Sequence, residues 1–434
     1  MLNWSKRNYL FQSEKYGWLL YAGLSNSFFH LSDELKESID FYLKDAKEDA
    51  FDEEVLEIFK KTGVLSSYTD EELDRMYLLN WLKMQTQSNQ LSLTIATTLA
   101  CNFRCSYCYE KENYKNIMMT EEVADKIIEY VLQTKKQRVS IEWYGGEPLL
   151  NVHIIKYINE KLKETNIENS QAIVTNGYLL TKDVIKMFHK YNVTQIQITL
   201  DGDKETHNKR RPHVTDSDSF SRIMDNLELL YMYSKRNNYK PNVAIRVNID
   251  KNNESDYSRI LNMIKSKFYD YYYVYFAFVR SINSCSDITD GIFRSTDEKD
   301  FIDNLKEKYS IDYKDYYPNH YGCYFCGAQS MNSYVLDPEG YMYKCWDDVG
   351  DLKKAVASLK EKTMRNNIVE SDFVIKSLAI FNDKCKNCFM IYHCMGGCPN
   401  QALKNKEHCP LVKENTNEYL EKHYELCKKK DYVY

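Results

Sequence analysis

Three cysteines within eight residues could bind one metal centre. Cys101, Cys105 and Cys108 form a C-x3-C-x2-C array directly after an apolar, strand-like run from Leu91 to Ala100. Soft thiolates bind zinc or iron–sulfur clusters. Zinc sites usually close with four protein ligands, yet the next cysteine in the sequence is Cys285. The array therefore favours an iron–sulfur cluster in which one iron stays open for a substrate or cofactor.

A second, longer cysteine series lies toward the C-terminus. It runs C-x13-G-x4-C and later C-x2-C-x5-C-x3-C, with one further cysteine on each side. Its members are Cys323, Cys326, Cys345, Cys385, Cys388, Cys394, Cys398 and Cys409. The chain has 13 cysteines and its N-terminus, MLNWSKRNYL, lacks a signal-peptide pattern, so metal ligation is favoured over a disulfide framework. Around Asp337 to Gly340 the pattern predicts a hairpin.

Between the two series, strand and helix patterns alternate. The predicted strands are 91–100, 139–144, 172–175, 194–200, 243–249 and 272–279, and the predicted helices are one capped by Thr120, 152–164, one starting at Thr181, 218–234 and 254–266. Such alternation is typical of parallel βαβ units. Six units are fewer than the eight of a closed barrel. We therefore expect a partial (β/α)6 TIM-like barrel that is open on one side.

Short polar motifs follow several of these strands. WYGGEPLL contains Gly145, Gly146 and Glu147, TNG begins at Thr175, and TLDGDKETHNKRR runs from Thr199 to Arg211. Loops at the carboxyl ends of parallel strands carry the chemistry in such folds. The glycines allow close backbone approach, and the glutamate supplies an acceptor. We expect these motifs to surround the cysteine array.

Together the motifs resemble those of radical S-adenosylmethionine (radical SAM) enzymes, and the C-terminal series resembles the SPASM branch. The resemblance implies that Cys101, Cys105 and Cys108 hold a [4Fe–4S] cluster whose open iron takes SAM. The implied SAM-binding residues are Tyr107, Gly145, Gly146, Glu147, Thr175, Asn176, Thr199, Asp201 and Arg211, with Glu147 near the methionine amino group and Arg211 near its carboxylate. Asp201 and His207 have an alternative role as a cap and a loop brace. Arg246 and Asn248 are further candidates.

The SPASM resemblance also implies two auxiliary [4Fe–4S] clusters, three clusters in all. The first would take Cys326, Cys345 and Cys398, and the second Cys385, Cys388, Cys394 and Cys409. Cys323 either closes the first cluster or leaves it with an open iron for a substrate thiolate. Cys285 and Cys427 are expected to be ordinary thiols.

The first 68 residues predict a small α+β unit. Its strand-like runs are 9–12, 18–21 and 28–31, and its helices begin at Asp33, capped by Ser32, and at Glu53. This order resembles the PqqD-like element that adds a leader peptide as an extra strand; the alternative is a plain structural extension. Residues 69–90 predict a linking helix capped by Thr69. The barrel is then expected over 91–315 and the SPASM domain over 316–434.

Net charge and the lengths of the apolar runs limit the kinds of partner that we expect. The net charge of −5 is spread over interspersed charges, so we expect no nucleic-acid partner, and no run of about 18 apolar residues predicts a membrane span. We expect a cytoplasmic radical SAM/SPASM maturase. It would abstract hydrogen from a ribosomally made precursor peptide with a leader, using a reducing partner such as flavodoxin or ferredoxin, and leave an oxidised or cross-linked side chain. The alternatives are an anaerobic sulfatase-maturating enzyme that forms formylglycine and a non-enzymatic zinc or iron–sulfur protein.

Overall fold

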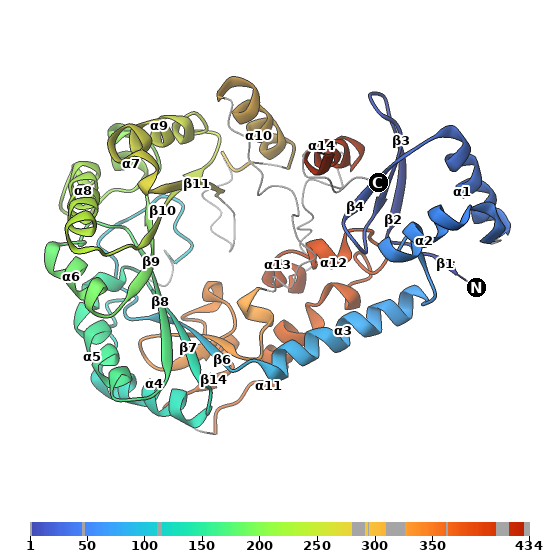
Figure 1. The fold of residues 1–434 in the computed structure, drawn as a ribbon. Coiled ribbons are helices and arrows are strands. Elements are labelled where there is room, and N and C mark those ends of the chain that lie inside the picture. The colour runs from blue at the N-terminus through green and yellow to red at the C-terminus, as the bar shows by residue number, and fades with distance from the viewer. Residues whose placement is uncertain are drawn as a thin grey trace. The chain divides into compact units, whose positions relative to one another are not determined.

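The computed structural model describes residues 2–45, 48–110, 115–279, 291–293, 295–309, 326–361, 363–404 and 416–428. The chain divides into two compact units. Unit 1 contains Met1–Gln87, Ile311–Met331 and Ser371–Tyr434, and unit 2 contains Ser88–Ser310 and Asn332–Glu370. Figure 1 follows both along the chain. Within the described residues, no helix is long and apolar enough to cross a membrane.

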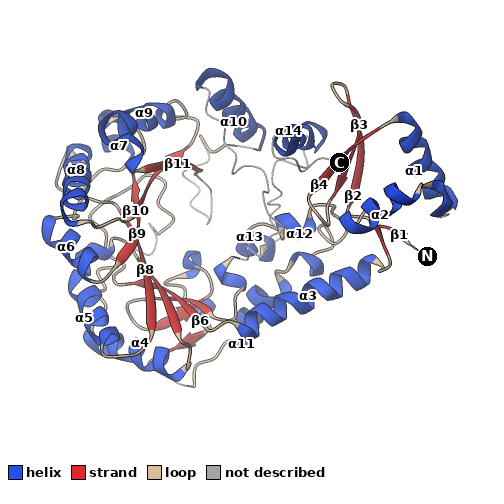
Figure 2. Cartoon of the chain, viewed as in Figure 1, coloured by secondary structure: helices blue, strands red, loops and turns tan. Residues whose placement is uncertain are grey.

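Unit 2 is built on six parallel strands that pair in the order of the sequence. They are β6 (Gln90–Ala96), β7 (Arg138–Tyr144), β8 (Glu168–Thr175), β9 (Val193–Thr199), β10 (Asn242–Ile249) and β11 (Tyr273–Phe278). The connecting helices are α4 (Glu121–Gln133), α5 (Val152–Lys163), α6 (Lys182–Lys190), α7 (Lys204–Arg210), α8 (Ser219–Asn237) and α9 (Asp256–Phe268). The helices cover the outer face of the curved sheet (Figures 1 and 2). The predicted partial barrel is confirmed, and α7 is an addition that the sequence pattern did not predict.

Local sequence explains these elements. Along β7 every second side chain, including Ile141 and Trp143, is buried against the helices, because successive side chains of a strand point to opposite faces. Thr120 and Thr181 accept hydrogen bonds from backbone N–H groups at the starts of α4 and α6. Each satisfies a donor that the first helical turn leaves unpaired. The predicted helix starts are therefore confirmed.

The C-terminal segment extends this sheet. β12 (Ser333–Leu336) pairs in parallel with β6, and β13 (Tyr341–Tyr343) and β14 (Ala357–Ser358) follow antiparallel. The result is a nine-stranded sheet. The hairpin between β12 and β13 was predicted, whereas its pairing with β6 was not. Unit 2 also contains α10 (Ser295–Tyr309), and α11 (Asn367–Ser371) leads back to unit 1.

Unit 1 contains the predicted N-terminal strands in an antiparallel sheet. They are β2 (Asn8–Ser13), β3 (Gly17–Ala22) and β4 (Ser27–Leu31), with β1 (Asn3–Trp4) paired separately to β5 (Leu65–Ser66). The helices are α1 (Asp33–Asp45), α2 (Glu53–Thr62), α3 (Asp70–Gln87), α12 (Ile391–Cys394), α13 (Pro399–Leu403) and α14 (Thr416–Lys428). Ser32 and Thr69 accept bonds from Leu35 N and Glu72 N, so both predicted caps are confirmed.

Two apolar clusters cover this small sheet. One joins Leu20 and Phe29 to α1 and α2, and the other joins Tyr21 and Phe28 to α14. Because strand side chains alternate, neighbouring residues of β3 serve opposite clusters. The first 87 residues and the last 64 therefore fold together. The domain boundaries expected from the sequence stay predictions.

Candidate active site

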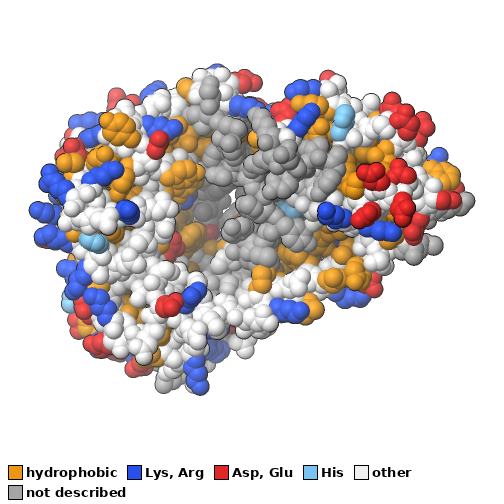
Figure 3. Space-filling view, in the orientation of Figure 1, with side chains coloured by type: hydrophobic (Ala, Val, Ile, Leu, Met, Phe, Trp, Pro, Cys, Tyr) orange, Lys and Arg blue, Asp and Glu red, His pale blue; other side chains and the backbone are white. Residues whose placement is uncertain are grey.

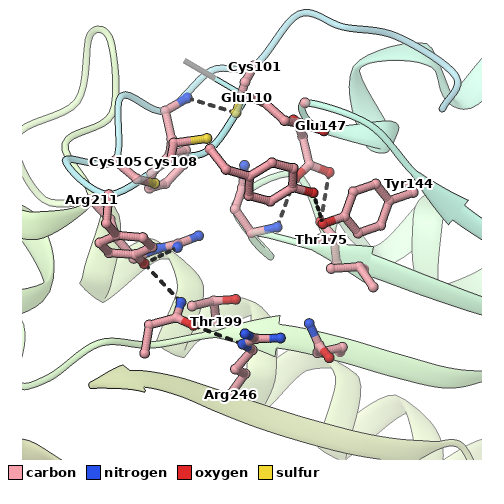
Figure 4. Close-up of a pocket in the computed structure, with 18 of the residues that line it drawn as sticks. Cys101, Cys105, Cys108, Glu110, Tyr144, Glu147, Thr175, Thr199, Arg211 and Arg246 are labelled. Carbon is pink, nitrogen blue, oxygen red and sulfur yellow. Dashed lines mark hydrogen bonds between the residues drawn. The ribbon is translucent and has the colours of Figure 1, made fainter. Parts of the chain in front are cut away.

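A cavity of about 300 Å³ lies at the carboxyl ends of the parallel strands of unit 2. Its wall brings together eleven of the residues that the sequence singled out: Cys101, Cys105, Tyr107, Cys108, Gly145, Gly146, Glu147, Thr175, Asn176, Thr199 and Arg211. Figure 4 shows the three cysteines on one loop, with Arg211 close to Cys105 and Glu147 to one side of the loop. Arg246 and Asn248, the further candidates on β10, also line it. Asp201 does not belong to the wall.

The loop with Cys101, Cys105 and Cys108 is held by the last residue of α7 and by the segment that follows it. Arg104 N donates to Pro212 O at 2.8 Å, and Ser106 N donates to Arg210 O at 3.0 Å. Phe103 forms a bridge with His213 and packs against its ring. The motif after β9 therefore supports the loop through its backbone as well as through Arg211.

Burial dominates the chemistry of the free thiols. It raises the pKa of Cys101 far above the usual range and that of Cys105 to about 11, although the Arg211 charge opposes the shift at Cys105. A bound metal offsets this cost because it takes the thiolate form. No group of three His, Cys, Asp or Glu in the described parts of the chain converges tightly enough for a single metal ion. Thiolates that ligate different irons of one cluster stand farther apart.

Two glycines let the loops approach one another. A Cβ on Gly145 would lie 2.2 Å from Thr98 O, and one on Gly146 would lie 2.3 Å from Ala100 O. Gly145 also has a φ of 118°, which L side chains rarely adopt. Both positions require glycine, for the reason that the sequence predicted.

Glu147 ties β7 to β8. Its carboxylate is 1% exposed and accepts bonds from Thr175 Oγ1 at 2.7 Å, Asn176 N at 2.8 Å and Leu149 N at 3.0 Å. Burial raises the carboxyl pKa, and these donors oppose the shift. Glu147 thus orients the end of β8 in the cavity wall. Its contact with the methionine amino group stays a prediction.

Tyr107 is the centre of a buried polar network. Its hydroxyl donates to Asp201 and accepts from Arg211 Nη1 at 2.7 Å and from Asn248 Nδ2 at 3.0 Å. Arg211 is 7% exposed, and its Nε has no hydrogen-bond partner among the described residues. A buried cation with an unused donor needs an anion. An amino-acid carboxylate fits that requirement.

Asp201 supports this network from behind. It is fully buried, accepts from Asn248 N at 3.2 Å and lies 3.7 Å from Arg210 Nε. His207 is also fully buried, and its Nδ1 accepts from Asp201 N at 3.4 Å. The cap of α7 is Asp203, so Asp201 and His207 brace the loop without capping a helix. A direct contact between Asp201 and a cofactor stays a prediction.

An aromatic wall completes the cavity. Tyr144 stacks on Trp346 with ring centroids 5.3 Å apart, and the hydroxyls of Tyr109 and Tyr144 lie 2.5 Å apart. Glu110 lies beside them, and burial, followed by the charge of Asp347, raises its pKa to about 7. In the sequence, Tyr144 belongs to the WYGGEPLL motif, whereas no motif singled out the other members. The signal for Trp346 was its position next to Cys345 in a cysteine motif.

Comparison with known families decides the class. Residues 95–264 match the model of the Radical SAM superfamily, a range that includes the loop with the three cysteines and the strands β7 to β10. The chain is a radical SAM enzyme. Its radical SAM domain implies a [4Fe–4S] cluster and SAM, and the three cysteines and Arg211 fit those groups.

The curated relatives include sulfatase-maturating enzymes and a cyclopropyl synthase. The chain is 28% identical over 351 residues to a cysteine-type anaerobic sulfatase-maturating enzyme of Clostridium novyi, covering 74% of this chain and 89% of that one. It is 30% identical to the radical SAM cyclopropyl synthase TigE of Paramaledivibacter caminithermalis over 42% of this chain and 40% of that one.

Solved structures share the fold. The sulfatase-maturating enzyme anSMEcpe with bound AdoMet aligns with a TM-score of 0.63 at 21% identity, over 80% of this chain and all of that one. SuiB of Streptococcus suis bound to its precursor peptide SuiA aligns with a TM-score of 0.52 at 14% identity, over 93% of this chain and 97% of that one.

The other predicted ligands of this radical SAM enzyme are distributed over both units. Cys385 and Cys388 lie on one loop of unit 1, where Cys388 N donates to Cys385 O at 2.8 Å, and Cys394 ends the helix α12 that follows this loop. Cys326 and Cys398 belong to unit 1 and Cys345 to unit 2; the cluster predicted for these three stays a prediction. Cys323, Cys409 and Cys285 lie outside the described residues. Cys427 is buried in the cluster of α14, as expected for a packing thiol.

Proposed function

We propose that this radical SAM enzyme modifies a ribosomally made precursor peptide. It abstracts hydrogen from a core residue and leaves an oxidised side chain or a thioether or carbon–carbon cross-link. It carries two auxiliary [4Fe–4S] clusters in addition to the SAM cluster, and a flavodoxin or ferredoxin reduces it in the cytoplasm. The substrate carries a leader that the N-terminal domain recognises.

The cavity residues have distinct tasks in this proposal. Cys101, Cys105 and Cys108 hold the cluster, and Arg211 pairs with the SAM carboxylate. The bound cluster and SAM supply a 5′-deoxyadenosyl radical that takes hydrogen from the substrate. The chain places the two reactants next to each other and excludes water. Tyr144 and Trp346 provide an apolar wall for the peptide.

The N-terminal α+β domain carries the choice of substrate. The alignment with SuiB, a protein solved with its precursor peptide, extends over 93% of this chain, whereas that with anSMEcpe leaves out a fifth. A small sheet flanked by helices offers edge strands that an extended peptide can join. Such edge strands favour a leader-bearing substrate.

A second candidate is a sulfatase maturase that oxidises Cys or Ser to formylglycine. It is favoured by the similarity to the Clostridium novyi enzyme, which spans 89% of that protein. Such a substrate needs no leader. The two candidates therefore differ in whether the N-terminal domain contributes to turnover.

The test uses the full chain, reconstituted anaerobically with iron and sulfide and supplied with SAM and dithionite. Three peptides are compared: a complete precursor encoded next to the gene, its core without the leader, and a cysteine-containing sulfatase peptide. We expect 5′-deoxyadenosine and a mass change for the complete precursor only, and neither with Cys105→Ala. Modification of the sulfatase peptide alone would transfer the assignment to the second candidate.

Figure 3 bears on the expected partners. Lys and Arg side chains are interspersed with Asp and Glu over the face it shows. A nucleic-acid-binding surface would gather Lys and Arg side chains into a patch or stripe. A peptide that binds through its backbone and apolar side chains requires no such patch.

A further inference from the structure

Arg7 is a fully buried cation at the start of the N-terminal sheet. Its side chain is 0% exposed. Nη1 donates to Lys386 O at 2.7 Å and to Cys388 O at 3.2 Å, although these residues are 379 and 381 positions away in the sequence. A buried guanidinium is stable only when acceptors surround it. Here the backbone of the loop that carries Cys385 and Cys388 provides these acceptors.

The opposite charge comes from α3. Arg7 Nη2 pairs with Asp74 Oδ1 at 2.7 Å, and the same oxygen accepts from the hydroxyl of Tyr392 at 2.5 Å. The guanidinium also lies over the ring of Tyr392, 5.2 Å from its centroid. The ion pair of Arg7 and Asp74 thus joins the N-terminal domain, the linking helix α3 and the loop that carries Cys385 and Cys388, all within unit 1.

The backbones also meet directly. A Cβ on Gly23 would lie 2.2 Å from Phe389 O, and Gly23 O is 2.7 Å from His393 Nε2. The ring of Phe389 lies 4.6 Å from that of Tyr9 and 5.8 Å from that of Tyr21. The loop therefore has the N-terminal sheet as its support.

The Nε–H group of Arg7 is the donor of this side chain that the contacts above do not use. Its Nε is buried without a hydrogen-bond partner among the described residues. The sulfurs of a cluster held by Cys385, Cys388 and Cys394 would be acceptors of the kind that a buried N–H group needs.

We propose that Arg7, fixed by Asp74, is a positioning residue for the second auxiliary cluster and raises its reduction potential. The N-terminal domain is then part of the support of that cluster as well as a site for the leader. This inference rests on the proposed function, because it takes Cys385, Cys388 and Cys394 as cluster ligands. A nearby positive charge and N–H donors favour the reduced, more negative cluster.

The test compares Arg7→Met, Arg7→Lys and the control Arg75→Met in the reconstituted full chain. Arg75 lies next to Asp74 on α3, but its side chain is 72% exposed. We expect Arg75→Met to keep about twelve irons per chain and Arg7→Met to keep about eight, since one [4Fe–4S] cluster is lost. Cleavage of SAM by Arg7→Met should persist, which shows that the protein is folded and the SAM cluster intact.

Arg7→Lys keeps the positive charge but changes the geometry of the N–H donors. This variant therefore tests the inference even if Arg7→Met does not fold. We expect a redox titration followed by electron paramagnetic resonance to show a lower potential for one cluster only. Amide hydrogen exchange over residues 385–394 should be faster than in wild type. Twelve irons with unchanged potentials in both Arg7 variants would overturn the inference alone. About four irons in wild type would instead overturn the auxiliary clusters of the proposed function.

Discussion

Removing one hydroxyl from Tyr107 tests the network behind the cavity. In Tyr107→Phe, Arg211 Nη1 loses an acceptor at 2.7 Å, and Asp201 loses the donor that lies against its buried carboxylate. A hydrogen bond to a charged group contributes about 1.5–3 kcal/mol. Arg211 already has an unused Nε, so its orientation depends on this contact. Even the lower value corresponds to roughly tenfold weaker SAM binding.

The assay is anaerobic equilibrium dialysis of SAM against reconstituted protein whose iron content has been measured. We expect Tyr107→Phe to bind SAM about tenfold more weakly. In the background of Arg211→Met, the same change should cost less than about threefold, because the guanidinium that the hydroxyl orients is already absent. The matched control is Tyr178→Phe, which removes a hydroxyl that donates to Asp216 at 2.8 Å outside the cavity wall.

Equal effects of Tyr107→Phe in both backgrounds would refute this reasoning. They would mean that the hydroxyl acts on SAM independently of Arg211. A weaker affinity in Tyr178→Phe would show that the method responds to any lost hydroxyl near the site.

Three other changes address separate parts of unit 2. Gly146→Ala should lower the iron content and cost about 1–3 kcal/mol through overpacking against Ala100 O, as thermal unfolding would show. Trp346→Ala should leave SAM affinity within about threefold but reduce peptide product per 5′-deoxyadenosine by up to about tenfold, because the stack on Tyr144 is lost. Asp337→Asn should stabilise the protein by up to about 3 kcal/mol at neutral pH. Burial raises the pKa of Asp337 to about 6, so the folded wild type holds its proton more tightly and loses stability as pH rises from its unfolded pKa through the folded one. The gain should be visible in melting temperatures at about pH 8 and absent at about pH 4.

The controls for these changes are available in the same chain. Gly17→Ala adds a Cβ where no atom lies within 4 Å, so iron content should be unchanged. Unaltered coupling between SAM cleavage and product in Trp346→Ala would exclude that side chain from substrate placement. A stability difference for Asp337→Asn that stays constant with pH would show that its carboxyl does not titrate in this range.

Local patterns were sufficient for the strands, the helix starts and the cysteine loop. The alternation in β7 and the hydroxyl residues Thr120 and Thr181 act over a few positions, so the sequence expresses them directly. The spacing of Cys101, Cys105 and Cys108 is local in the same sense. The strand order followed as well, because short right-handed βαβ connections place successive strands side by side.

Tertiary structure alone decided contacts between distant segments. Three such contacts join residues hundreds of positions apart. They are the pairing of β12 with β6, the stack of Trp346 on Tyr144, and the hydrogen bonds from Arg7 to the loop that carries Cys385 and Cys388. No periodicity encodes which buried donor will meet which acceptor, since that choice depends on how whole elements pack. The role of Asp201 shows the same limit: its motif placed it near the cavity, and only its burial against Tyr107 and Asn248 made it a brace.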